Sequence, residues 1–261
     1  MSSVNSSEST LASPGGHDQE RMTFDSHMHV GDFPLFNVSL DRDGLVALMH
    51  ETGISQALLF SPDNELVREI AEQVPGVWAL YWANPHRPDA AAEARAYLEH
   101  PRFRGIKLHP LLDSYHPNDP SVHPLMELAG ERDLPVLFHT GHPIFTLPWS
   151  IEEVAANFPE TKVVFGHMGH GNVVYINASI EIACRRPNVY LETSGMPMHT
   201  KIREAVERAG ADRVLYGSDA PFHHPAVEQL KVRLSGLGPD DLARVLGGNA
   251  ARLYLPAQVP A

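Results

Sequence analysis

The sequence predicts a single-domain (β/α)8 barrel, and three observations support this prediction. Eight short runs rich in β-branched and aromatic residues alternate with amphipathic stretches, which is the pattern of a parallel sheet covered by helices. Seven strand-to-strand steps separate His29 from Asp219 at about 27 residues a step, close to the roughly 30 residues per unit of such barrels. A doubly wound sheet is the alternative, but it normally carries a Gly-rich phosphate loop, and the sequence has no GxGxxG.

Each of the eight expected strands is flanked by turn residues. The strands are expected over 23–29, 56–60, 76–82, 104–108, 135–139, 162–166, 189–192 and 213–217. Helices are expected between them, for example over 41–51, 90–99 and 150–157, where Asp41 and Ser150 are suitable N-caps. Gly247 and Gly248 are interpreted as a turn. We therefore expect a flexible leader over 1–21, the barrel over 22–255 and a short tail over 256–261.

Composition excludes several classes of protein. With 43% hydrophobic and 20% charged residues, the 261-residue chain can bury a core. Residues 1–21 are polar and Ser-rich, without the order of a signal peptide, so we expect a cytoplasmic protein. The net charge of −12 argues against nucleic acid and anionic membranes as partners. The expected partner is a small-molecule substrate, and a homo-oligomer is left open. The single Cys184 is expected to be a buried thiol without a catalytic role.

Histidines are unusually frequent, sixteen against twenty Lys plus Arg, and several fall where strands end. Catalytic groups of a barrel project from the C-terminal ends of its strands, and five of the expected strands end on a candidate ligand. His27 and His29 are two residues apart on the first strand, so they point to the same side. The other strand ends are His109, His139, His167 and Asp219. One histidine at a strand end packs more often than it binds metal, but five aligned positions predict a site for Zn, with Mn, Fe or Co as alternatives.

Several segments resemble the amidohydrolase superfamily, in particular its compact amidohydrolase-2 branch, over residues 22–255. They are FDSHMH, GIKLHP, LFHTGHP, VVFGHMGH, VYLETSG, DRVLYGSDAPF and LGGNAARLY. The resemblance implies a compact metal-dependent barrel enzyme without the small accessory β-sandwich that many hydrolytic members of the superfamily carry. It implies that His27, His29 and His139 are metal ligands. It implies that Asp219 contacts the metal and takes a proton from the attacking water. His167 would bind a second ion in two-metal members, or hydrogen-bond the water or substrate in one-metal members.

Lys107 has two readings that stay open here. The resemblance allows a carbamate on this lysine that bridges two metal ions, so the ion count is one or two. A lysine that pairs with an acid or grips an anionic substrate group is the ordinary alternative. Five residues at or just beyond strand ends are expected to bind substrate: His109, His142, His170, Trp82 and Phe222. Glu192, at the end of the seventh strand, is expected to orient His167 or to form an ion pair at the rim.

Hydrolysis of an amide, lactone or ester bond is the favoured function. A bound ion activates water and polarises the substrate carbonyl, and Asp219 carries the proton to the leaving group. Nonoxidative decarboxylation of an aromatic or unsaturated acid is the alternative, with one metal ion and an unmodified Lys107. A third hypothesis is an inactive barrel that binds a small molecule. No GxSxG motif is present, so a serine nucleophile is not expected.

Overall fold

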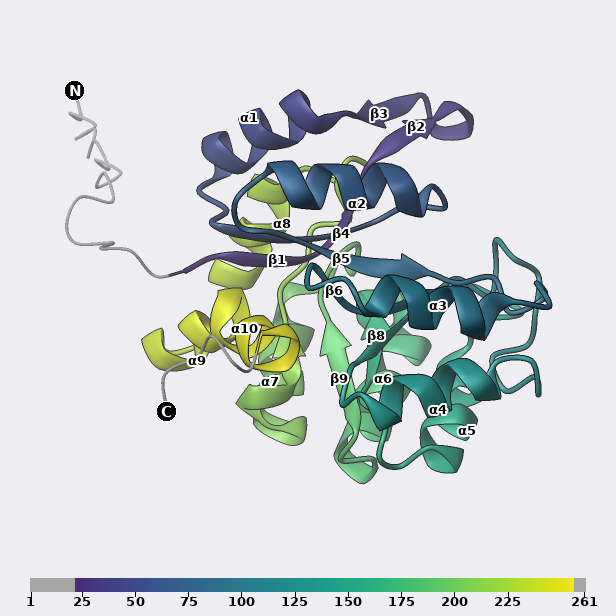
Figure 1. The fold of residues 1–261 in the computed structure, drawn as a ribbon. Coiled ribbons are helices and arrows are strands. Elements are labelled where there is room, and N and C mark those ends of the chain that lie inside the picture. The colour runs from purple at the N-terminus through teal and green to yellow at the C-terminus, as the bar shows by residue number, and fades with distance from the viewer. Residues whose placement is uncertain (1–21, 256–261) are drawn as a thin grey trace, which may run out of the picture.

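Figure 1 shows a computed structural model of the chain, which describes residues 22–255. Eight parallel strands form the inner wall in the order β1-β4-β5-β6-β7-β8-β9-β10. Their bounds are β1 Phe24–His29, β4 Gln56–Phe60, β5 Val77–Trp82, β6 Phe103–Leu108, β7 Val136–His139, β8 Val163–Gly166, β9 Val189–Glu192 and β10 Val214–Leu215. The predicted barrel and all eight strands are confirmed, while the expected leader and tail lie outside the described residues.

Helices connect the strands and surround them. They are α1 Arg42–Thr52, α2 Asn64–Gln73, α3 Ala90–Leu98, α4 His123–Glu131, α5 Pro148–Asn157, α6 Val173–Arg185, α7 His199–Ala209, α8 Pro225–Arg233, α9 Pro239–Ala243 and α10 Asn249–Tyr254. Asp41 caps α1 as predicted, because its Oδ1 accepts a hydrogen bond from Gly44 N at 2.8 Å. The prediction for Ser150 is wrong, since α5 begins two residues earlier at Pro148, a residue suited to a first helical turn. No helix within residues 22–255 is both long and apolar enough to span a bilayer.

Two further predictions fail for reasons of packing. Gly247 and Gly248 lie inside a helical segment rather than a turn, where the helix presses against the start of β1. A Cβ on Gly247 would lie 2.1 Å from Met22 O, so only glycine allows this contact. Cys184 is exposed rather than buried, because it falls on the outer face of α6.

A small hairpin in the connection between β1 and α1 was not predicted. It comprises β2 Gly31–Phe33, a 3-10 turn η1 Pro34–Phe36 and β3 Val38–Leu40, with the two strands antiparallel. Three-residue strands are too short to give a readable period of two. Figure 1 shows the hairpin at the top of the view, beside α1 and α2.

One end of the barrel is filled, and this fixes where the site lies. Inward side chains from most of the strands form an apolar cluster with α10: Phe24, Leu58, Phe60, Trp78, Leu80, Trp82, Leu137, Val164, Leu215 and Tyr254 are among its members. A larger apolar layer lies between the strands and the outer helices. The interior near the N-terminal ends is therefore packed, and the polar interior side chains gather at the C-terminal ends of the strands.

Candidate metal centre

Backbone bulges aim the candidate ligands of two strands into the barrel. Between the pairs Asp25–Ala57 and Met28–Leu59, β1 advances three residues while β4 advances two, so β1 contains one extra residue. Phe24 points inward below this bulge, and His27 and His29 do so above it. A comparable irregularity occurs in the pairing of β5 with β6 and precedes Lys107.

The barrel closes at this site through individual hydrogen bonds rather than a regular ladder. Asp219 N donates to His27 O at 2.7 Å, and His29 N donates to Ala220 O at 2.7 Å. The carboxylate of Asp25 is buried across the same seam, where its Oδ1 accepts from Ser218 N at 2.9 Å and from His27 N at 3.2 Å. Burial raises the pKa of Asp25 to about 7. These contacts hold the end of the first strand beside the residue that follows the last strand.

Asp219 lies between the two histidines of the first strand. Its Oδ1 is 3.3 Å from His27 Nε2 and 3.1 Å from His29 Nε2. Ligand atoms of His27, His167 and Asp219 all lie within 4.8 Å of one another, a grouping that could hold a metal ion. Burial alone would raise the pKa of Asp219, but the neighbouring imidazoles outweigh it and hold that pKa well below its usual range. Asp219 is therefore a carboxylate at neutral pH.

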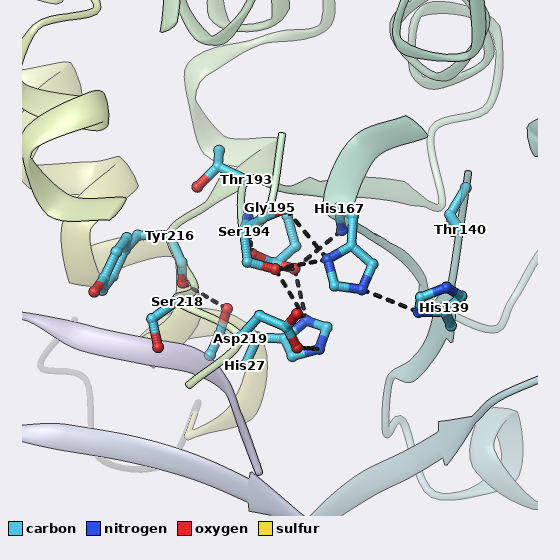
Figure 2. Close-up of polar contacts among 12 residues, drawn as sticks. His27, His139, Thr140, His167, Thr193, Ser194, Gly195, Tyr216, Ser218 and Asp219 are labelled. Atoms are coloured by element: carbon cyan, nitrogen blue, oxygen red, sulfur yellow. Dashed lines mark hydrogen bonds and ion pairs between the residues drawn. The ribbon is translucent and has the colours of Figure 1, made fainter. Parts of the chain in front are cut away.

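Glu192 sets the orientation of His27 through a hydrogen bond to its ring. Its Oε2 lies 2.7 Å from His27 Nδ1, and it also accepts from His167 N at 3.1 Å and from Ser194 Oγ at 2.8 Å. In Figure 2, the side chains of His27, His167 and Ser194 lie close together, and dashed lines mark the polar contacts around them. We expected Glu192 either to orient His167 or to form an ion pair at the rim. It does orient a histidine, but the ring that it contacts is that of His27, and it contacts His167 only through the backbone N–H. The Nδ1 proton of His27 is thereby engaged, which leaves Nε2 to face Asp219.

This arrangement fits a cation. His27 Nε2 is buried without a hydrogen-bond partner among the described residues, and it faces a carboxylate oxygen. A lone pair opposite an anionic oxygen is unfavourable unless a proton or a metal ion lies between them. Burial and Lys107 act to lower the pKa of His27, but Glu192 and Asp219 outweigh them and raise it, so a proton at Nε2 and a metal ion compete for this position. Neutral imidazoles and a carboxylate are the donor types that zinc and similar divalent ions prefer.

His139, another predicted ligand, adjoins this group through His167. His139 Nδ1 and His167 Nε2 lie 3.0 Å apart (Figure 2), and His139 Nε2 lies 2.8 Å from His142 Nδ1. Burial lowers the pKa values of His139 and His167 well below the usual range, so both are neutral imidazoles. His167 follows β8 with φ of 66° and Asp219 follows β10 with φ of 64°, left-handed conformations that cost energy in residues other than glycine. Strained backbone of this kind is common where side chains must be aimed at a ligand.

Lys107 is a buried amine whose Nζ has no hydrogen-bond partner among the described residues. Its Nζ lies 4.6 Å from the centre of the Phe60 ring. Burial lowers its pKa to about 7, against the opposing effect of Asp219 and Glu192. A substantial fraction of this lysine is therefore the neutral, nucleophilic amine near pH 7, so both readings of Lys107 remain chemically available.

All five residues predicted to bind substrate border the candidate ligands. The Trp82 indole is nearly parallel to His109, at 5.3 Å between ring centres, and His109 is stacked on His139 at 4.0 Å. The ring of Phe222 lies 5.1 Å from that of His29. On the other side, the rings of His142 and His170 are 4.2 Å apart, and His170 lies 5.4 Å from His167. Their roles stay predictions.

The sequence interpretation missed several neighbours of the site. They are Asp25, Ser194, Phe33 and His223, whose Nε2 lies 3.9 Å from Asp219 Oδ2. Only Asp25 carried a signal, since it precedes the HxH pair in the same strand. Surface grooves occur elsewhere, for example a cavity of about 530 Å³ beside α1 and α2, and it is lined by none of the candidate ligands.

Comparison with known proteins identifies the family. The amidohydrolase family profile matches residues 24–255, nearly the whole described chain. The chain belongs to the amidohydrolase family. It is 26% identical over 239 residues to an L-fucono-1,5-lactonase of Burkholderia ambifaria, covering 79% of this chain and 80% of the relative. It is 27% identical over 114 residues to a gamma-resorcylate decarboxylase of Polaromonas sp., covering 37% of this chain and 35% of that one.

Solved structures support the same fold. An uncharacterised TIM-barrel protein from Bordetella bronchiseptica matches with a TM-score of 0.77 at 22% identity, over 91% of this chain and 100% of that one. An amidohydrolase from Burkholderia multivorans with bound zinc matches with a TM-score of 0.72 at 18% identity, over 89% and 99%. A dihydroxybenzoic acid decarboxylase from Polaromonas sp. with bound manganese matches with a TM-score of 0.71 at 16% identity, over 91% and 98%. The protein is thus an enzyme of a family whose members include hydrolases and carboxy-lyases.

Proposed function

We propose that the chain is a zinc-dependent hydrolase that opens the ring of a small, uncharged lactone. The observation that carries the proposal is the Asp219 carboxylate, which is held unprotonated beside the two Nε2 atoms of His27 and His29. A hydrolase needs a base next to an activated water, and this carboxylate meets that need. The family relationship and the lactonase relative add support.

We assign the metal ligands to His27, His29, His139 and Asp219, with His167 at the same ion or at the attacking water. A divalent ion bound by these residues would supply Lewis acidity, polarising a carbonyl and acidifying water. Zinc is preferred because the donors are mostly neutral imidazoles. The zinc bound in the Burkholderia multivorans amidohydrolase supports this choice. The manganese bound in the dihydroxybenzoic acid decarboxylase makes manganese the main alternative.

The reaction then needs little from the protein beyond proton transfer. Asp219 takes a proton from water as the water oxygen bonds to the acyl carbon. The ring C–O bond breaks, and the departing ring oxygen receives that proton from Asp219. The product is a hydroxy acid, and the carboxylate returns to its starting form. Glu192 keeps the imidazole of His27 in the tautomer that offers Nε2 to the ion.

The residues around the barrel mouth favour an uncharged substrate over an aromatic acid. The eight connections that follow the strands contain a single Arg or Lys among their residues, Arg87, which pairs with Glu93 at 2.6 Å. Recognition of a substrate carboxylate normally uses Arg or Lys placed at the site. Lys107 is the one amine among the neighbours of the site described above, and it is buried below the mouth. Hydrolysis of a neutral lactone fits this surface better than decarboxylation.

Two measurements test the proposal. Elemental analysis of the purified enzyme and of His27→Ala counts the ions, and we expect one zinc per chain and a loss in the variant. The zinc-loaded enzyme is then offered L-fucono-1,5-lactone, simple γ- and δ-lactones and 2,6-dihydroxybenzoate, with acid and carbon dioxide release followed separately. Acid release from a lactone supports hydrolysis. Carbon dioxide release from the aromatic acid without lactone opening would instead assign the carboxy-lyase reaction.

A mass measurement settles the state of Lys107 in the same preparation. We propose that it is a free amine beside a single ion, because potential ligand atoms among residues 22–255 gather in one group, that of His27, His167 and Asp219. An intact mass higher by one carbon dioxide, together with two ions per chain, would assign the bridging carbamate instead.

A further inference from the structure

The hairpin after β1 exposes large apolar side chains beside the candidate metal centre. Leu35 is 87% exposed and Phe36 is 56% exposed, both in the turn η1 at the hairpin tip. The hairpin belongs to the connection that leaves the first strand directly after His29. Exposing such side chains forgoes their burial, so a contiguous exposed group next to a catalytic centre calls for a ligand.

Aromatic contacts lead from the metal centre to this tip. The ring of His29 lies 5.7 Å from Phe33 and 5.1 Å from Phe222. Phe222 in turn lies 4.9 Å from Phe33 and 4.9 Å from Phe36. A single ring, that of Phe222, therefore separates the half-exposed Phe36 from the candidate ligand His29. The apolar surface is continuous with the site rather than an isolated patch.

The chemistry of the surrounding loop defines what such a surface would accept. Residues 30–41 contain no Lys or Arg, and their only charged side chains are Asp32 and Asp41. An anionic group would find no partner there, whereas an alkyl or aryl group would lose water-exposed area against the rings. Other connections at this end of the barrel also expose large apolar side chains, at Leu112, Ile144 and Met198.

We propose that Phe33, Leu35, Phe36 and Phe222 form a subsite for an apolar substituent of the substrate. The inference rests on the proposed lactone hydrolysis and narrows it, since the substrate is then a lactone that carries an uncharged alkyl or aryl substituent of several carbons. The reacting carbonyl lies at the metal centre, and the substituent lies along Phe222 and Phe36. A polyhydroxylated lactone has no apolar substituent to cover this surface, which then stays exposed to water.

The proposal has a quantitative consequence. Burying one methylene group changes a binding constant by about fourfold, so kcat/KM should rise by up to about fourfold per carbon until the substituent passes the hairpin tip. The first kinetic series is γ-butyrolactone, γ-hexalactone, γ-octalactone and γ-decalactone with the zinc-loaded enzyme. Phe36→Ala and Leu35→Ser should flatten the rise and leave γ-butyrolactone nearly unaffected. Leu230→Ala is the matched control, because Leu230 is 53% exposed on the outer helix α8.

A binding series separates this inference from the proposed reaction. Acetohydroxamate, hexanohydroxamate and octanohydroxamate chelate a metal ion through the same head group, so only the chain differs. We expect their affinities for the metal-loaded enzyme to rise with chain length in the wild type and in Leu230→Ala, and to rise much less in Phe36→Ala. A length-dependent affinity without any lactone opening would keep the subsite and reject the proposed reaction. Equal affinities along the series, or no binding at any length, overturns the subsite.

A second copy of the chain is the competing occupant of the hairpin. Sedimentation of wild type and Phe36→Ala at the concentrations of the binding assay distinguishes it. A monomeric wild type, or an unchanged oligomer in the variant, agrees with a substrate surface. Loss of an oligomer in Phe36→Ala together with an unchanged chain-length dependence would assign the hairpin to a subunit interface and overturn the proposal.

Discussion

Replacing Glu192 by glutamine tests the metal centre through a residue that does not contact the ion. The side chain is fully buried and accepts hydrogen bonds from His27 Nδ1 at 2.7 Å, His167 N at 3.1 Å and Ser194 Oγ at 2.8 Å. Glutamine keeps the shape, but its amide nitrogen is a donor. Both carboxylate oxygens of Glu192 accept hydrogen bonds in the wild type. In either orientation of the glutamine amide, an NH2 group therefore replaces one of these acceptors and faces another donor.

The magnitude follows from these contacts. If the NH2 group faces His27, the imidazole moves its proton to Nε2, and the lone pair that the ion needs is lost. If it faces Ser194, where Oε1 now accepts from the backbone N at 2.5 Å, a buried donor is left unsatisfied at about 1–3 kcal/mol. Loss of an outer partner of a ligating histidine typically weakens metal binding by about 10- to 100-fold. We expect Glu192→Gln to lie in that range.

Zinc affinity is measured by competition with a chromophoric chelator, and the stability of the metal-free form is measured by denaturant unfolding. Glu228→Gln is the control, because Glu228 is also buried and its Oε2 accepts from Gly195 N at 3.2 Å. The expected result is a selective loss of zinc affinity in Glu192→Gln. Equal zinc affinity in both variants and the wild type would refute the assignment of His27 as a ligand oriented by Glu192.

Four other predictions concern Lys107, Asp219, the ion and the helical segment that contains Gly247. In the metal-free protein, burial lowers the pKa of Lys107 to about 7 from an unfolded value of 10.5, so stability should rise with pH across that window. Lys107→Met should remove this rise in stability, which is worth a few kcal/mol at about 1.4 kcal/mol per unit of pKa shift. The denaturant midpoint is measured against pH, and the same pH profile in the variant and the wild type would contradict this prediction. Asp219→Asn should lower kcat/KM for the best lactone by at least about 100-fold, and wild-type turnover would reject Asp219 as the base. Zinc at 100 times its Kd should stabilise the fold by about 2.7 kcal/mol in calorimetry, and an unshifted Tm argues against a specific site. Gly247→Ala should destabilise by about 1–3 kcal/mol because its Cβ would overlap Met22 O, whereas Gly248→Ala, with 3.6 Å to the nearest atom, should be neutral or stabilising; equal effects would contradict the close contact.

The barrel could be predicted because each strand is readable by itself. Runs such as 56–60 and 189–192 are short, β-branched or aromatic, and bounded by turns, and the observed bounds agree with the expectation. The hairpin at 31–40 escaped because its strands are three residues long. Ser150 was misassigned because a proline at the first helical position set the helix start instead.

The candidate ligands could be predicted for a related reason. Parallel strands bring their C-terminal ends to one rim, so a histidine that ends a strand is placed near the others whatever the sequence distance. That rule gave His27, His139, His167 and Asp219, and the structure brings them together. It could not give the direction in which each ring nitrogen points.

That direction depends on contacts between residues far apart in the chain. Glu192 meets His27 across 165 residues, and Asp25 meets Ser218 across 193, so no local period or spacing reports either contact. Both are buried acids, whose charged form is costly unless it accepts hydrogen bonds. Each accepts from the backbone or ring of a residue beside the site, so the same contacts that stabilise the two carboxylates also fix His27 and the approach to Asp219. A buried acid near a cluster of histidines is therefore a signal for ligand orientation, and it becomes readable once the strand order of the barrel is known.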